Sequence, residues 1–245
     1  MPNPEHLARI KAGVRQWNQW RDDNPEIHLE LGDADLNEED LGNAKLAGAI
    51  LIDAKLRSTN LSGADLRGAD LNGANLSGAN LNGANLFGAN FVGANLSMAH
   101  LVGANLSRAH LGHANLRGAY LMGADMTGAG LLSTIFAGTD FRHIKGLDLC
   151  RHYGPSTVGI DAIVESKGEI PEGFLRCCGV PEQIIAYARS LVLEPIQFYS
   201  CFISYSNKDL EFAVRVNSDL RAQNLRSWFA DEDLKIGDRF QDSIE

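Results

Sequence analysis

The sequence predicts a mainly β fold in which the chain winds into a four-sided solenoid. A large apolar residue returns at every fifth position from Leu31 to Phe141, twenty-three times in succession, and nineteen of these residues are Leu. Alanine stands two positions before the large residue in eighteen of twenty-two cases from position 34 to position 139. Glycine stands two positions after it at twelve places between positions 63 and 138. These regularities decide the architecture of nearly half of the chain.

A period of five residues fits neither common element of secondary structure. On an α-helix, five residues advance about 500°, so each Leu would lie about 140° from the last and no apolar stripe would form. On a flat strand, an odd period would send successive Leu side chains to opposite faces. The pattern becomes coherent if the chain turns a corner every five residues. Four pentapeptides then make one coil, and the coils stack with every Leu inside.

The other positions of the repeat agree with this coil. The third residue of a type II turn has a positive φ, which glycine adopts without steric cost. The small alanines let the four walls approach closely, and the residue between the alanine and the next large apolar residue is mostly polar and points outward. These outward residues are Asp65, Asp70, Asn75, Asn80, Asn85, Asn90, Asn95, Asn105 and Asn115.

Residues 61–76 (LSGADLRGADLNGANL) resemble the pentapeptide-repeat family, and the resemblance covers about residues 29–145. It implies a right-handed quadrilateral β-helix. In a twenty-residue coil, residues i and i+20 share one column, and we expect a structural ladder of buried side chains along each column. Two such columns contain Leu71, Phe91 and Leu111, and Leu96, Leu116 and Phe136.

The N-terminal segment, residues 1–28, is predicted to be a capping helix over the open strand edges of the first coil. Asn3 can cap a helix over residues 4–21, and Pro4 suits its first turn. A cap predicts that Trp17 and Trp20 are both buried, whereas a docking helix for a partner predicts that at least one is exposed. Glu39 breaks the alanine rule, so we expect an irregular first coil from which Glu39 reaches water or a donor on the helix.

Residues 146–197 leave the repeat and are predicted to be a partly helical connector that also covers the upper end of the solenoid. Pro181 begins a helix that continues to about Leu193, and Pro195 ends it. In residues 198–245 the pattern changes again. A short apolar strand at 198–204, an amphipathic helix at 207–222 and a second strand at 225–229 follow in an order that implies a parallel sheet.

This last segment carries a second resemblance. Residues 202–206 (FISYS), followed by Asp209, and residues 228–237 (WFADEDLKIG) resemble the first part of a bacterial TIR domain. The resemblance implies TIR–TIR assembly in signalling and, in many bacterial members, cleavage of NAD. It places candidate nucleotide or assembly loops at Ser204, Tyr205, Ser206, Trp228, Asp231, Asp233, Leu234 and Gly237.

The segment resembles only the first β-α-β unit and the following loop of that domain. The helix that carries the catalytic glutamate of the family has no counterpart before Glu245, so we expect a truncated domain with no catalytic residue, no cofactor and no turnover in this chain. In an intact parent protein, NAD would be a possible substrate.

Composition excludes several functional classes, namely nucleic-acid-binding, membrane and metal-binding proteins. The formal net charge is −9, so the chain has no basic footprint for nucleic acid. No apolar run approaches the roughly 20 residues of a membrane span, and the N-terminus has no secretory signal pattern, which together predict a cytoplasmic protein without a membrane partner. The four cysteines lack CxxC spacing, and His100 and His110 lie two sides of the coil apart, so no metal site is expected.

Three functions follow from these features. The first is a non-catalytic repeat scaffold that presents a TIR signalling or effector module to protein partners, through TIR–TIR self-association above all. The second is an effector whose intact form cleaves NAD. The third, DNA mimicry by an acidic rod that inhibits topoisomerases, is disfavoured because Asp65, Arg67 and Asp70 are the sole Asp, Glu, Lys or Arg residues between Ser58 and Ser107.

Overall fold

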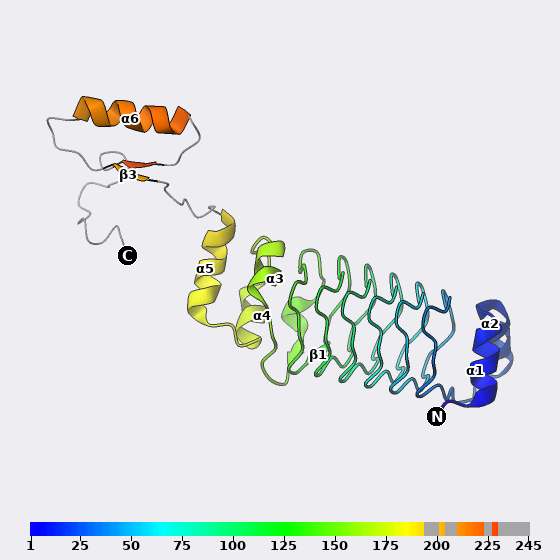
Figure 1. The fold of residues 1–245 in the computed structure, drawn as a ribbon. Helices are drawn as coiled ribbons and strands as arrows, with labels where there is room; N and C mark the ends of the chain where they lie inside the picture. Colours follow the sequence, from blue (N-terminus) through cyan, green and yellow to red (C-terminus); the bar gives the residue numbers. More distant parts are fainter. Residues whose placement is uncertain (194–200, 204–209, 223–226, 230–245) are drawn as a thin grey trace. The chain divides into compact units, whose positions relative to one another are not determined.

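The computed structural model describes residues 1–193, 201–203, 210–222 and 227–229. The chain divides into two compact units, Met1–Val192 and Leu193–Glu245. The first unit contains the helices α1 (Pro4–Lys11) and α2 (Val14–Asp23), a stack of coils, and the helices α3 (Ile160–Glu165), α4 (Glu172–Cys177) and α5 (Glu182–Leu193). Figure 1 shows the coils stacked one above another, with α1 and α2 at one end and α3 and α4 at the other.

The coils have twenty residues and four sides, as the five-residue period predicts. Parallel β-bridges join residues twenty apart on all four sides, from Glu30↔Ile50 to Asp125↔Lys145. In the middle coils, three backbone amides of each pentapeptide bond to a neighbouring coil. In the repeat around Leu96, the Asn95 amide donates to the Ala74 carbonyl at 2.9 Å, and the amides of Leu96 and Met98 donate to the next coil at 2.8 and 2.9 Å. The chain thereby satisfies its backbone between coils although each bridge is one residue long.

The interior consists of the periodic apolar residues. All twenty-three, from Leu31 to Phe141, are at most 1% exposed, and so are most of the alanines beside them. Three of the four exceptions to the alanine rule are buried threonines whose hydroxyls donate to a backbone carbonyl: Thr59 to Leu36 at 2.7 Å, Thr134 to Leu111 at 2.8 Å and Thr139 to Leu116 at 2.9 Å. Threonine is therefore tolerated because its one polar group has a partner inside the wall.

Glu39, the fourth exception, leaves the interior. Its carboxylate is partly exposed and lies 3.3 Å from the Lys11 ammonium of α1. The predicted donor on the helix is therefore present, but the prediction of an irregular first coil is wrong. Bridges at Asp35↔Lys55 and Asp40↔Asn60 keep the register of the later coils, because a side chain that turns outward leaves the backbone pairing unchanged.

The corners require a left-handed residue at every turn. The residue two after each large apolar residue has a positive φ throughout, and at Gly83, for example, φ is 65° while the Ala84 amide donates to the Leu81 carbonyl at 3.0 Å. Ten corners carry another residue in this conformation: Asp33, Glu38, Asn43, Asp53, Ser58, Met98, Arg108, His113, Ser133 and His143. The coil geometry imposes this conformation even where it is unfavourable for an L-residue.

The N-terminal cap consists of two helices, α1 (Pro4–Lys11) and α2 (Val14–Asp23), rather than the predicted single helix over residues 4–21. Gly13 separates them with a φ of 124°, which no helix contains. Asn3 caps α1 as expected, since its side chain accepts hydrogen bonds from two backbone amides.

α2 closes the edge of the first coil. The Trp17 indole donates to the Lys45 carbonyl at 3.0 Å, and Asn18 both accepts from the Lys45 amide at 2.8 Å and donates to the Asn43 carbonyl at 2.9 Å. Trp17 is fully buried, whereas Trp20 is half-buried with the guanidinium groups of Arg9 and Arg21 over its ring. Capping explains Trp17, and the partial exposure of Trp20 departs from the expectation for a pure cap.

The C-terminal end of the solenoid is closed by short elements. β1 (Gly130–Leu131) pairs in parallel with β2 (Arg151–His152), and a 3₁₀ turn, η1 (Leu147–Leu149), precedes β2. The helices α3 (Ile160–Glu165), α4 (Glu172–Cys177) and α5 (Glu182–Leu193) follow. Phe174 of α4 packs against Phe136 and Phe141 with ring centroids 6.0 and 5.4 Å apart, and Ser166 Oγ accepts the Phe141 amide at 2.9 Å. These contacts plug the open end of the tube.

The second unit contains a β-α-β arrangement in the order expected from the sequence. β3 (Cys201–Ile203) pairs in parallel with β4 (Ser227–Phe229), and α6 (Leu210–Ala222) connects them. Ala213 and Asn217 form the buried side of α6, whereas Phe212 is 69% exposed.

Replacing Leu96 with Ala should destabilise the solenoid by about 2–5 kcal/mol, because it opens a cavity in a filled column between neighbouring coils. The measurement is the free energy of unfolding by denaturant. The matched control is Phe87→Ala, which removes an exposed side chain and should change stability by no more than about 0.5 kcal/mol. Equal effects of the two substitutions would contradict the buried column.

Candidate interaction surface

Most of the TIR-like site residues expected from the sequence lie outside the described residues. These are Ser204, Tyr205, Ser206, Asp231, Asp233, Leu234 and Gly237. Trp228 lies in β4, where it pairs in register with Phe202 of β3. The two strands of the expected unit are therefore adjacent and parallel, while the loops expected to border a nucleotide stay predictions.

The expected ladder residues lie inside the solenoid. Leu71, Phe91 and Leu111 follow one wall, Leu96, Leu116 and Phe136 follow the next, and all six have no exposed surface. Any interaction of the solenoid with another molecule must therefore use the outward positions.

Most outward positions in the middle coils serve the fold itself. The side-chain amide of Asn95 donates to Asn75 at 3.5 Å, and its oxygen accepts from Asn115 at 3.4 Å and from the backbone amide of Ser97 at 3.1 Å. Such amide ladders hold neighbouring coils together and use up the polar atoms that a ligand would otherwise contact.

One side of the solenoid departs from this polar pattern toward the C-terminal end. Along one column the outward residue changes from Asn60 and Asn80 to His100 and Tyr120. Three exposed apolar side chains surround this change: Met122 at 59%, Met98 at 54% and Tyr120 at 49% exposure. No other large apolar side chain in residues 31–141 is as exposed.

We call this feature the apolar groove and define it by Met98, Val102, Tyr120 and Met122. It has a volume of about 490 Å³, a floor that includes Gly118, and a rim that includes Asp140 and Glu165 of α3. The sequence pattern contained a signal for it, because a comparison of residues twenty apart shows Asn giving way to Tyr120.

The fold positions each side chain of the groove. Met98 stands at a corner with a φ of 58°, and its sulfur lies over Gly118, where a Cβ atom would be 2.6 Å from the sulfur. The Tyr120 ring stacks on His100 at a centroid distance of 4.7 Å. Glycine at 118 therefore leaves room for the Met98 sulfur in this position, and the stacked coils preform the groove.

The rim of the groove is acidic. Arg142 donates hydrogen bonds to the Asp140 carboxylate, at 2.6 Å for the shortest, and these bonds hold the pKa of Asp140 below its usual value. The same bonds, together with the charges of Asp140, Glu169 and Glu165, raise the pKa of Arg142. The two carboxylates that line the groove, Asp140 and Glu165, therefore share the single cation Arg142.

Two models of known protein families match the sequence of this chain. A model described as pentapeptide repeats matches residues 30–63, 64–103 and 104–143. Residues 30–143 belong to the pentapeptide-repeat family. A second model, described as a TIR domain, matches residues 201–245, so the pentapeptide-repeat solenoid is joined in one chain to TIR sequence.

Solved structures of pentapeptide-repeat proteins are also similar to this chain. HetL from the cyanobacterium Nostoc sp. strain PCC 7120, described as involved in regulation of heterocyst differentiation, is 28% identical over 51% of this chain and 72% of its own, with a TM-score of 0.28. Rfr23 from the cyanobacterium Cyanothece 51142 is 30% identical over 52% of this chain and 96% of its own, with a TM-score of 0.36. The comparison with curated proteins gave no match.

The charge pattern of the pentapeptide-repeat solenoid disfavours DNA mimicry. In the middle coils, Asp65 is paired with Arg67 at 2.7 Å, and Asp70 accepts a hydrogen bond from Asn90 at 2.9 Å. A mimic of DNA needs dense uncompensated negative charge along its length. The uncharged asparagine ladders of these coils supply none.

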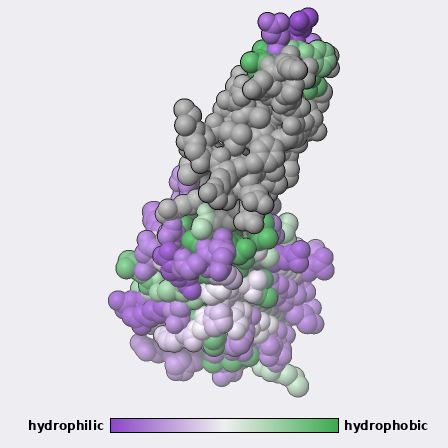
Figure 2. All heavy atoms as spheres, turned by 90° about the vertical axis from the view of Figure 1, so that its left-hand side faces the viewer, coloured by the Kyte–Doolittle hydropathy of each residue, from purple (hydrophilic) through white to green (hydrophobic). Residues whose placement is uncertain are grey.

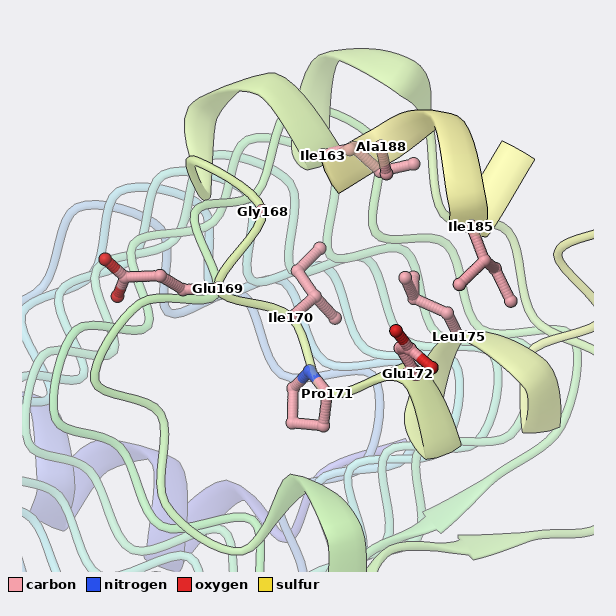
Figure 3. A pocket seen from close by; sticks show the side chains of 9 residues that line it. All are labelled: Ile163, Gly168, Glu169, Ile170, Pro171, Glu172, Leu175, Ile185 and Ala188. Carbon is pink, nitrogen blue, oxygen red and sulfur yellow. The ribbon is translucent and has the colours of Figure 1, made fainter. Parts of the chain in front are cut away.

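A second hollow lies at the C-terminal end of the pentapeptide-repeat solenoid. It has a volume of about 290 Å³ and is lined by apolar side chains of α3, α4, α5 and the loop between α3 and α4. Figure 3 shows Ile163, Ile170, Leu175 and Ile185 gathered around it, while the Glu169 carboxylate points away. Figure 2, which faces this end, shows hydrophobic side chains in separate patches among hydrophilic ones. The hollow is the packing seam along which α5 rests on the cap.

Reactive and metal-binding groups are not assembled in the described part of the chain. No group of three His, Cys, Asp or Glu residues could hold a metal ion there. Burial raises the pKa of the Cys150 and Cys178 thiols to about 12, so both are poor nucleophiles at neutral pH. Within the same residues, no helix has the length and apolar character that a membrane crossing needs.

The Asp140–Arg142 pair predicts a pH dependence of stability. Since the folded-state pKa of Asp140 is depressed, the stabilisation is fully present above the unfolded value of 3.8 and is lost as the pH falls below it. Asp140→Asn should therefore lower the free energy of unfolding by a few tenths to about 1 kcal/mol at about pH 7, because the pair is partly exposed. The difference from the parent should shrink as the pH falls below 3.8, and a pH-independent difference would contradict the assignment.

Proposed function

We propose that this protein is a non-catalytic scaffold in which the pentapeptide-repeat solenoid presents the TIR module for assembly with protein partners. The observation that carries the proposal is the construction of the solenoid. Its interior is filled with apolar side chains, and its coils are joined by hydrogen bonds at every pentapeptide. Such a solenoid is stiff and its surface keeps one shape, which suits the presentation of another module.

The TIR sequence supports protein partners, because TIR domains mediate protein–protein interactions. In the second unit, α6 exposes apolar side chains that can make such contacts: Phe212 is 69%, Val214 49% and Leu210 39% exposed. Self-association through the TIR module is the form of assembly that we favour, since aromatic side chains commonly dominate the energy of protein interfaces.

Substituting Phe212 with Ser in the full chain should weaken self-association about tenfold or more, as removal of an exposed aromatic anchor does. Light scattering across a concentration series measures the effect. Phe87→Ser is the matched control, because it removes an exposed phenylalanine from the solenoid instead. A parent protein that stays monomeric at high micromolar concentration, or equal effects of the two substitutions, would contradict TIR-mediated assembly.

The scaffold proposal also predicts no catalysis by this chain. Incubation with NAD should release no nicotinamide above the buffer blank, as measured by chromatography. Release of nicotinamide by the purified chain, with the same rate across independent preparations, would replace the scaffold with the NAD-cleaving alternative.

A further inference from the structure

The apolar groove lies where the hydrogen bonds of the outward asparagine side chains are no longer made. At Asn80 the side chain donates to Asn60 at 3.2 Å and accepts from the backbone amide of Asn82 at 3.1 Å. Tyr120, two coils further along the same column, cannot make the second of these bonds, because its phenol lies too far from its own backbone. Nor does burial compensate, since Tyr120 is 49% exposed. Tyr120 instead stacks on His100, which leaves about half of its surface exposed, and a departure of this kind from the local pattern is typical of a functional site.

The neighbouring outward position also changes from polar to apolar residues toward the C-terminal end. In successive coils it is occupied by Ser62, Asn82, Val102 and Met122, so polar residues give way to apolar ones at the same height as His100 and Tyr120. Met98 adds a third flexible apolar side chain at the adjoining corner. Methionine adapts its shape to different apolar partners, and exposed tyrosine supplies a rigid platform, so the groove suits a protein segment better than a single small molecule.

The charged side chains around the groove indicate which kind of protein segment it would bind. Asp140 and Glu165 line the groove, and Asp161 lies beside Gly138 in its wall. Arg142 compensates one of these three carboxylates through its ion pair with Asp140 at 2.6 Å. The net negative charge beside these apolar side chains is complementary to a segment that carries both an apolar side chain and a cation.

We propose that the apolar groove binds a basic amphipathic segment of a partner protein. An apolar side chain of the segment packs on Tyr120 and Met122, and a Lys or Arg beside it faces Glu165. The carboxylates of Asp140, Asp161 and Glu165 beside the groove favour a basic occupant over an acidic one. The proposal deepens the scaffold function by naming the partner-binding surface on the solenoid, and its test does not involve the TIR module.

The test uses the full chain and two labelled synthetic helices, one with a Leu face and a Lys face and one in which Glu replaces every Lys. Fluorescence anisotropy measures the affinity of each. The parent should bind the Leu/Lys helix and not the Leu/Glu helix. The double variant Tyr120→Asn/Met122→Ser should lose at least tenfold in affinity. Its fold is expected to persist, because Asn80 and Ser62 occupy the equivalent positions in earlier coils.

Matched variants separate the groove from general attraction to an acidic protein. Phe87→Ser, on another side of the solenoid, should leave the affinity for the Leu/Lys helix unchanged. Glu165→Gln should weaken binding of the Leu/Lys helix about threefold, and less at high salt. Equal binding of both helices, no binding of either, or undiminished binding by the folded double variant would overturn the proposal. Self-association that the double variant abolishes would also overturn it, by assigning the groove to a second copy.

Discussion

The stacking of twenty-residue coils on one another is the constraint on which the rest of the first unit depends. Each coil has no hydrophobic core of its own, because its apolar side chains point into a tube that its neighbours complete. Each coil likewise satisfies its outward backbone amides through the coils before and after it. Both ends must therefore be closed, and the structure closes one with Trp17 and Asn18 and the other with Phe174 and Ser166.

Features that arise from repetition were predictable from the sequence, and features that arise from single contacts were less so. The Leu and Gly spacings predicted the coil, its corners and its buried columns. Gly13 was visible, yet the break between α1 and α2 was missed because the apolar spacing of Ile10, Val14 and Trp17 suggests a continuous helix. The six-residue helices α3 and α4 are too short for periodicity to reveal, and Phe174 holds α4 by packing on distant rings.

The apolar groove shows why the five-residue pattern alone does not reveal a candidate site. Position by position, Tyr120 and Met122 are ordinary exposed residues. Their difference from the polar pattern appears when residues twenty apart are compared, because Asn60 and Asn80 precede Tyr120 in its column. In the proposed function, the groove would be one surface for partners on the solenoid, and the TIR module would provide a second one on the unit that follows α5.

Residue-resolved amide hydrogen exchange tests the continuous stack most directly. The amides that bond between coils, such as those of Asn95, Leu96 and Met98, should exchange slowly and with nearly one common free energy throughout the middle coils, because one coil cannot open without exposing its neighbours. Exchange of these amides at the rate of an unstructured peptide, or with unrelated rates in successive coils, would contradict a single cooperative solenoid.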